Sequence, residues 1–150
     1  MADIYSADGA IAAVAVAPGT TALAIFASAF TRARVHFVDF SVGGVPVGDN
    51  LLNWLVRRLT TVGTNTPVTP APFDLAAPAA QLSAAENFTA EPTFTTQLLQ
   101  RPTHQRAGYQ WNLGTAKEIL IPAIANAGLG ITPSHASYNG SAQANAEWLE

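Results

Sequence analysis

The three histidines are the residues best suited to metal binding or proton transfer, and their spacing indicates neither. His36, His104 and His135 are far apart in the chain and form no His-x-His or His-Glu-x-x-His pattern. The chain has no cysteine, so thiolate nucleophiles, disulfides and cysteine-bound zinc are excluded. We predict surface or interface histidines and no metal site. The alternative is that the three meet inside a barrel, as in a metal-dependent cupin-like enzyme.

The carboxylates give no clearer sign of catalysis. The ten Asp and Glu residues are dispersed, whereas cleavage of a glycosidic bond needs two carboxylates that flank it. Asp39 stands out because it shares a face with the apolar residues of a predicted strand. We expect it to form a structural ion pair with Arg32, Arg34 or Arg57. The serines follow no Gly-x-Ser-x-Gly pattern. These observations predict no enzyme, no catalytic residue and no cofactor.

Arginine and aromatic residues point to binding instead. Arg57, Arg58, Arg101 and Arg106 are four of the seven basic residues, and arginine beside aromatic residues is typical of interfaces. The aromatic candidates for an interface or a carbohydrate platform are Trp54, Trp111, Trp148, Tyr109, Tyr138 and Phe94. Filling of the core is the alternative that we favour for the tryptophans.

The composition suits a protein that lies against other subunits. Of the 150 residues, 49% are hydrophobic and only 11% are charged, and Lys117 is the single lysine. A free monomer usually carries more charge. The net charge of −3 offers no basic surface for nucleic acid or for a membrane. The segment Met1-Ala-Asp-Ile-Tyr-Ser has no basic start, so we expect no signal peptide.

The stretch 10–30 holds two uncharged apolar runs. Pro18-Gly19-Thr20-Thr21 separates them, where a membrane-spanning helix would be interrupted and a hairpin would turn. Basic residues do not flank both sides, as they often do beside a membrane helix. We therefore predict a hairpin of two paired strands.

Polar and apolar residues alternate over 32–40, which predicts a half-buried strand with Ala33, Val35 and Phe37 on its apolar face. The segment 51–60 fits an amphipathic helix as well as a strand. Its β-rich neighbourhood favours the strand.

Further strands are expected towards the end of the chain. Asn139-Gly140 is the strongest hairpin signal. The predicted strands cover 94–100, 109–113, 118–121, 129–131 extending towards 136, and 142–149. In total the pattern predicts one all-β domain over 1–150, an antiparallel β-sandwich or jelly roll of about eight strands.

Residues 64–92 are rich in Pro, Ala and Thr and are predicted to form one long, mostly irregular excursion. Its few large apolar residues are candidate anchors for a partner: Phe73, Leu75, Leu82 and Phe88. The alternative is that Phe73 and Phe88 attach the loop to its own sandwich. Deletion of 76–86 is then expected to leave the sandwich folded and to weaken assembly. Arg57, Arg58 and Trp148 complete the candidate interface.

Most of the chain resembles decoration or cement proteins of tailed bacteriophage capsids, which have jelly-roll-like folds. The segments that carry this resemblance are AAVAVAPGTTALAIF, RARVHFVDFSVGG, TPVTPAPFDLAAPAAQLSAAENFTAEPT, YQWNLGTAKEILIPAIANAGLGI and AEWLE. The resemblance implies a homo-oligomer, often a trimer, that binds and stabilises the lattice of the major capsid protein. It implies a place on the capsid exterior after synthesis in the host cytoplasm, and no catalytic residues. The alternative function is a carbohydrate-binding or glycan-cleaving jelly-roll module.

Overall fold

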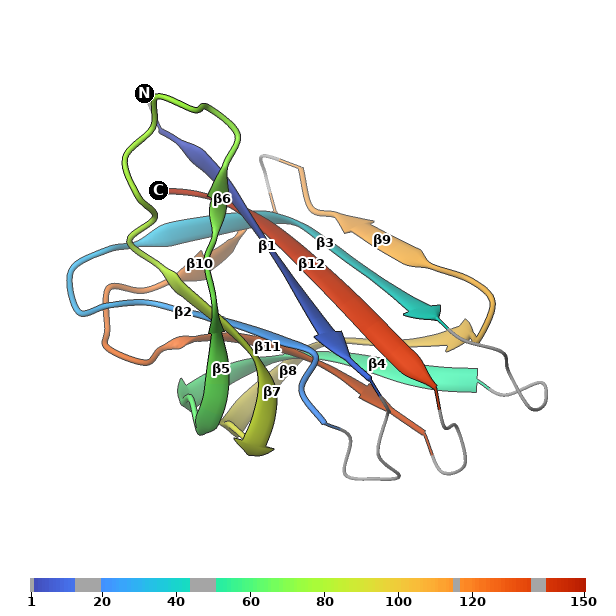
Figure 1. Ribbon diagram of the computed structural model, residues 1–150. Coiled ribbons are helices and arrows are strands. Elements are labelled where there is room, and N and C mark those ends of the chain that lie inside the picture. Colours follow the sequence, from blue (N-terminus) through green and yellow to red (C-terminus); the bar gives the residue numbers. More distant parts are fainter. Residues whose placement is uncertain (1, 13–19, 44–50, 115–116, 136–139) are drawn as a thin grey trace.

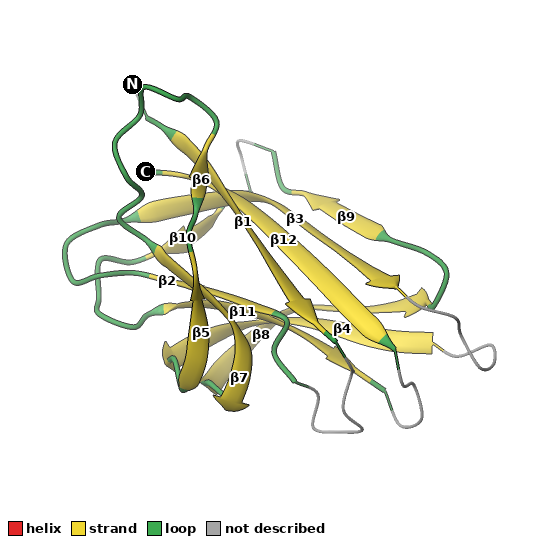
Figure 2. Cartoon of the chain, viewed as in Figure 1, coloured by secondary structure: helices red, strands yellow, loops and turns green. Residues whose placement is uncertain are grey.

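The computed structural model shows two antiparallel β-sheets packed against each other (Figure 1, Figure 2). It describes residues 2–12, 20–43, 51–114, 117–135 and 140–150, and none of these residues is helical. The predicted all-β antiparallel sandwich is confirmed. No helix in the described ranges is long and apolar enough to cross a membrane.

Twelve strands are present in the described residues, against about eight predicted. They are β1 (Ile4–Ile11), β2 (Leu23–Phe26), β3 (Ala33–Gly43), β4 (Leu51–Thr61), β5 (Thr64–Val68), β6 (Ala71–Pro72), β7 (Ser83–Ala90), β8 (Thr93–His104), β9 (Tyr109–Asn112), β10 (Ile119–Ile121), β11 (Gly128–Ser134) and β12 (Ser141–Leu149). Sheet I has the order β10-β3-β12-β1-β6, and β9 also pairs with β3. Sheet II has the order β5-β7-β2-β11-β4-β8.

Two connections that are predicted as hairpins instead join the two sheets. β1 pairs with β12 and β6 in sheet I, whereas β2 pairs with β7 and β11 in sheet II. The predicted hairpin over 10–30 is therefore wrong, and part of it lies outside the described residues. The same holds at Asn139-Gly140, because β11 belongs to sheet II and β12 to sheet I. A turn dipeptide allows the chain to reverse but does not select which strands pair.

The strand predicted over 32–40 is present as β3, but its buried face changes part-way along. The register against β12 shifts so that Trp148 pairs with Val35 and Glu147 pairs with Phe37, which leaves His36 as an extra residue. Such a β-bulge reverses the alternation beyond it. Ala33 and Val35 are buried before the bulge, and Val38 and Phe40 after it. The prediction that Phe37 and Asp39 share the face of Val35 is therefore wrong.

The ambiguous segment 51–60 is a strand, as predicted. Leu52, Trp54 and Val56 alternate into the core, so the period of two decides against the helix. The strands predicted in the last third of the chain correspond to β8, β9, β10, β11 and β12.

The predicted irregular excursion over 64–92 is mostly wrong. β4 continues into β5 and β7 continues into β8, and the two arms pair from Leu51↔His104 through Thr61↔Thr93 to Thr64↔Ala90 and on to Val68↔Ala84. This long bent ribbon places β4 and β8 at one edge of the β2–β11 pair and β5 and β7 at the other. Pro67 is tolerated because β5 is an edge strand. The longest irregular part of the segment is 73–82.

Gly63 lies where this ribbon bends. Its backbone has φ +77°, which L-residues with side chains rarely adopt. A Cβ at this position would lie 2.1 Å from the carbonyl oxygen of Ala90 in the opposite arm. The bend of the ribbon therefore depends on glycine at this position.

The core lies between the sheets and is built around aromatic pairs. Phe40 stacks on Trp54 with ring centroids 4.6 Å apart, and Tyr5 stacks on Trp148 at 6.2 Å. Such pairs add about 0.5–1.5 kcal/mol beyond the burial of area. A separate cluster of buried residues, Ala24, Leu59, Ala85 and Phe88, has Phe26, Val62 and Phe94 packed against it.

Candidate interaction surface

Large exposed apolar side chains gather at one end of the sandwich, where β1 begins and β12 ends. We call this the apolar end and define it by Phe30, Phe73, Leu75 and Ile124. Their loops lie at the left and upper left of Figure 1. Leu75 is 98% exposed and Phe30 is 92% exposed. Side chains of this size are rarely left so fully in water without a reason, and several together indicate a contact surface.

Leu75 is held at the tip of a tight turn. The Asp74 carboxylate accepts a hydrogen bond from the Ala76 amide at 2.8 Å, and the Asp74 carbonyl accepts one from the Ala77 amide at 3.0 Å. This pattern, in which Asp bonds to the backbone two residues on, rigidifies turns. Leu75 is therefore presented in a preorganised position.

The whole 73–82 loop is fastened to β1 and to Glu150, the residue that follows β12. The Phe73 amide donates to the Ile4 carbonyl at 2.9 Å, and the Tyr5 hydroxyl donates to the Pro78 carbonyl at 2.9 Å. At the other end of the loop, the Glu150 carboxylate accepts hydrogen bonds from the Gln81 and Leu82 amides at 2.7 and 2.8 Å. Because both ends are held, little conformational entropy remains to be lost when a partner binds.

The other two residues of the apolar end lie on adjacent loops. The Ala27 amide donates to the Ala127 carbonyl at 2.9 Å, and the Asn126 amide donates to the Ala27 carbonyl at 3.0 Å. These bonds join the β2–β3 loop, which carries Phe30, to the β10–β11 loop, which carries Ile124.

Of the seven predicted contact residues, three lie in the chain's own core. Leu82 and Trp148 are buried between the sheets, and Phe88 is buried in the cluster around Ala24. Their predicted place in an interface is wrong, because a side chain inside the domain has no surface to offer. For Phe88, the alternative of packing on its own sandwich holds. Phe73 and Leu75 are exposed as the interface prediction required.

The two predicted arginines are engaged within the chain. Arg57 Nη2 donates to Thr132 Oγ1 at 3.0 Å, and the guanidinium lies 3.7 Å from the centroid of the Phe94 ring. Burial lowers the pKa of Arg57, and the nearby negative charge of Glu91 opposes this shift. Arg58 Nη1 donates to the Leu120 carbonyl at 2.9 Å and so links sheet II to sheet I. Both act as internal ties in this fold.

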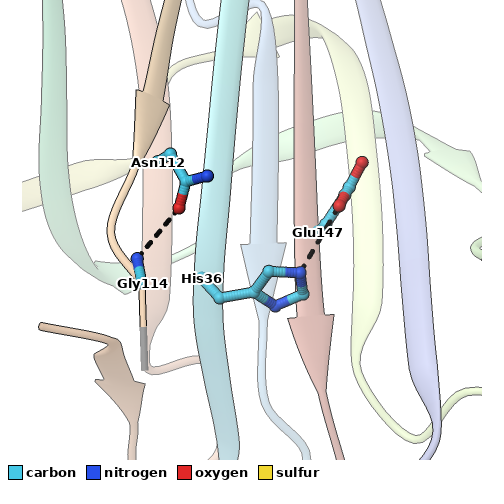
Figure 3. Close-up of polar contacts among 4 residues, drawn as sticks. All are labelled: His36, Asn112, Gly114 and Glu147. Carbon is cyan, nitrogen blue, oxygen red and sulfur yellow. Dashed lines mark hydrogen bonds and ion pairs between the residues drawn. The ribbon is translucent and has the colours of Figure 1, made fainter. Parts of the chain in front are cut away.

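The histidines lie on three separate strands or strand ends. His36, at the bulge of β3, has Nε2 3.4 Å from a carboxylate oxygen of Glu147 on β12 (Figure 3), and its Nδ1 is buried without a hydrogen-bond partner among the described residues. His104 ends β8, and His135 follows β11. Within the described ranges, no three His, Asp or Glu side chains are arranged to hold a metal ion.

Asp39 does not form the expected ion pair with an arginine in the described structure. It lies on the outer face of sheet I, beside an open hollow of about 470 Å³. The side chains lining this hollow are polar or small, and its charged residues are Asp8, Asp39 and Glu86. The bulge at His36 turns Asp39 outward, and sequence periodicity could not reveal that.

Sequence reasoning also missed Phe30 and Ile124. Phe30 ends the second apolar run of the stretch 10–30, and Ile124 lies between the turn residues Pro122 and Gly128. A large apolar residue beside turn residues is the only signal they carry. Comparison of the chain with protein-family models, curated proteins and solved structures finds no match.

Proposed function

We propose that the protein is a structural virion protein that decorates a capsid, binding and stabilising the lattice of the major capsid protein. In this proposal it acts without catalysis or a cofactor, as a homo-oligomer on the capsid exterior, and the apolar end faces the lattice. The resemblance to phage decoration proteins suggested the class. The exposure of Phe30, Phe73, Leu75 and Ile124 at one end of a rigid sandwich is the observation that carries the proposal.

The energetics of this end favour a protein partner. Full burial of a Leu or Phe side chain stabilises a complex by about 1.5–3 kcal/mol. Leu75 and Phe30 lie on short turns, and a partner with matching apolar pockets would bury both at little entropic cost. The Asp74 turn and the bonds from β1 and Glu150 keep the 73–82 loop in the required position.

The carbohydrate-binding alternative needs a groove with exposed Trp or Tyr side chains. Tyr5, Trp54 and Trp148 are buried, and Tyr109 and Trp111 pack partly buried against the same core. The Trp and Tyr side chains in the described ranges are thus buried or partly buried and form no fully exposed aromatic platform for a sugar ring. Tyr138 lies outside those ranges. We do not propose this function.

A capsid-binding assay tests the proposal. Capsids of the source virus are prepared without this protein, and its binding is measured by co-sedimentation. Phe30→Ser combined with Leu75→Ser is expected to weaken binding at least about tenfold, because two apolar anchors are lost. Leu51→Ser is the control, since Leu51 is also exposed (58%) but is the first residue of β4, a strand that begins on the far side of Figure 1 from the apolar end. Equal binding by all three proteins would overturn the proposal.

A further inference from the structure

The outer face of sheet I carries its charges in a segregated pattern along the strands. The pairing register places Leu120, Arg34, Leu149 and Ile4 in one row across β10, β3, β12 and β1. A second row, five residues further along β3, holds Gln110, Asp39, Asn145 and Asp8. The side chains of both rows point away from the core, since their neighbours along each strand are the buried ones. We call the first the basic row, after Arg34, its one charged residue, and the second the acidic row, after Asp39 and Asp8.

The basic row has accessible positive charge. Arg32 and Arg34 line an open hollow of about 220 Å³ together with Ala2, Leu149 and the acidic Glu150. Glu118 lies 3.8 Å from Arg34 but is itself only 11% exposed, and the Arg34 side chain remains 61% exposed. The guanidinium therefore keeps donors that a further carboxylate can use.

The acidic row has negative charge without a basic neighbour. Asp39 has no hydrogen bond or ion pair to any described residue. Asp8 accepts a hydrogen bond from the Asn145 side-chain amide at 2.7 Å, and Glu86 accepts one from the Ala10 backbone amide at 2.8 Å and one from the Asn87 side-chain amide at 3.3 Å. The hollow that these carboxylates line has no Lys or Arg among its lining residues.

We propose that this face is a contact between two copies of the chain, packed face to face about a two-fold axis. The rows are four residues apart along β1 and β12, which is about 13 Å at about 3.3 Å per residue, because the fifth residue along β3 is the bulge residue His36. A two-fold axis parallel to the rows and near Phe37, which lies half-buried between them, brings the basic row of each copy over the acidic row of the other. Glu147, which pairs with Phe37 and lies 3.4 Å from His36 Nε2, then comes near its own copy at the axis. Each copy then supplies the charge that the other lacks. The facing rows are thus complementary in charge, which favours this pairing and its orientation.

This contact takes from the proposed function only the homo-oligomer and needs no capsid. The resemblance implied a trimer, whereas the charge pattern of the face is self-complementary under a two-fold rotation. A small cation at the acidic row is the competing occupant, and it would leave the basic row without a role.

Charge reversal tests the contact with the purified full chain, by sedimentation analysis at low ionic strength. The wild type is expected to dimerise at micromolar concentration. We expect dimerisation to weaken at least about tenfold in two variants, because like charges then face each other. One is the single variant Arg34→Glu, and the other is the double variant Asp8→Lys with Asp39→Lys. Mixing the two variants is expected to restore a dimer, since the facing rows are again opposite in sign.

Arg106→Glu makes the same change of charge at an exposed turn outside both rows and is expected to dimerise as the wild type does. Circular dichroism confirms that each variant is folded. The proposal would be overturned by a wild type that is monomeric or forms a trimer without a dimer. It would equally be overturned by variants that dimerise as the wild type does, or by a mixture of the two charge-reversed variants that stays monomeric. Because no capsid is present, failure here is distinguishable from failure of lattice binding.

Discussion

At the scale of single residues, carboxylates without a catalytic pattern act as acceptors for backbone amides. Glu91 accepts hydrogen bonds from both the amide and the hydroxyl of the fully buried Thr21, and Glu86 accepts one from Ala10. Charge-assisted hydrogen bonds of this kind contribute about 1.5–3 kcal/mol. Donor and acceptor are 70 residues apart for Glu91 and 76 for Glu86, so sequence spacing could not indicate these pairs.

Tyr5 gives a pH dependence of stability. Burial raises the pKa of Tyr5 above its ordinary value of 10.0, and the negative charges of Asp3 and Glu150 add to the shift. Folding therefore favours the protonated phenol, which donates to Pro78. This contribution is complete below pH 10 and is lost as the pH rises further, because only the unfolded chain then ionises freely. We expect the urea midpoint to fall between pH 9 and pH 11 more steeply for the wild type than for Tyr5→Phe. Parallel curves would contradict this role.

Gly63 gives a prediction with a matched control. Gly63→Ala is expected to lower the free energy of unfolding by at least about 1–3 kcal/mol, because it adds strain from a positive φ and a clash with Ala90. Gly114 also has a positive φ, +58°, but nothing lies within 4 Å of its Cβ position. Gly114→Ala should therefore lower the free energy of unfolding, measured with urea, distinctly less than Gly63→Ala does. Equal costs would show that the bend does not depend on the close approach at Gly63.

At the scale of elements, the edges of both sheets are blunted against strand addition. The edge strands β5 and β8 of sheet II contain Pro67 and Pro102, and register shifts interrupt the pairing of both. In sheet I, β6 is two residues long and ends at Pro72. Prolines, bulges and short edges all discourage pairing with another chain. Contacts with other subunits are therefore expected through side chains, as at the apolar end and on the face of sheet I.

The segment 76–86 includes most of the 73–82 loop and the first half of β7. Its deletion is now expected to unfold the domain, because it removes the core residue Leu82 and the first half of β7. This corrects the expectation from sequence that the sandwich would survive. Leu75→Ser should leave the thermal unfolding midpoint within a few degrees of the wild type, because Leu75 is exposed. A folded deletion variant in circular dichroism would contradict the assignment of β7.

The strands over 33–61 and after residue 93 could largely be predicted from the sequence, but those within 64–92 and the pairing of strands could not. Alternation identified β3, because each side of a strand meets a different environment, and the β-rich neighbourhood favoured the strand over 51–60. The hairpins expected around Pro18-Gly19 and Asn139-Gly140 failed, since local turn chemistry does not say in which sheet the next strand lies. The prediction of an irregular segment over 64–92 failed because β5 and β7 pair with each other and β7 also pairs with the distant β2, and proline and turn residues give no sign of such pairing.

The candidate site was predictable only in part, for a similar reason. Phe73 and Leu75 were found because large apolar residues are scarce in their segment. Leu82, Phe88 and Trp148 look the same in sequence, yet the ribbon and β12 carry them into the interior. The bulge at His36 likewise decides that Asp39 faces outward, and that single extra residue leaves no mark in the composition or the spacing.

At the scale of the whole molecule, two surfaces have different chemistry. The apolar end presents large side chains on tightly held loops, whereas the outer face of sheet I presents segregated charge. In our proposals, the first surface binds the capsid lattice and the second binds another copy. A protein with only 11% charged residues can thus cover much of its surface within one assembly.

Cryo-electron microscopy of the particle that co-purifies with the protein tests the proposed capsid binding most directly. We predict density for the sandwich on the outside of a capsid lattice, with Phe30, Phe73, Leu75 and Ile124 facing the capsid protein. Purification free of any particle, or a bound sandwich whose apolar end points to solvent, would contradict this prediction.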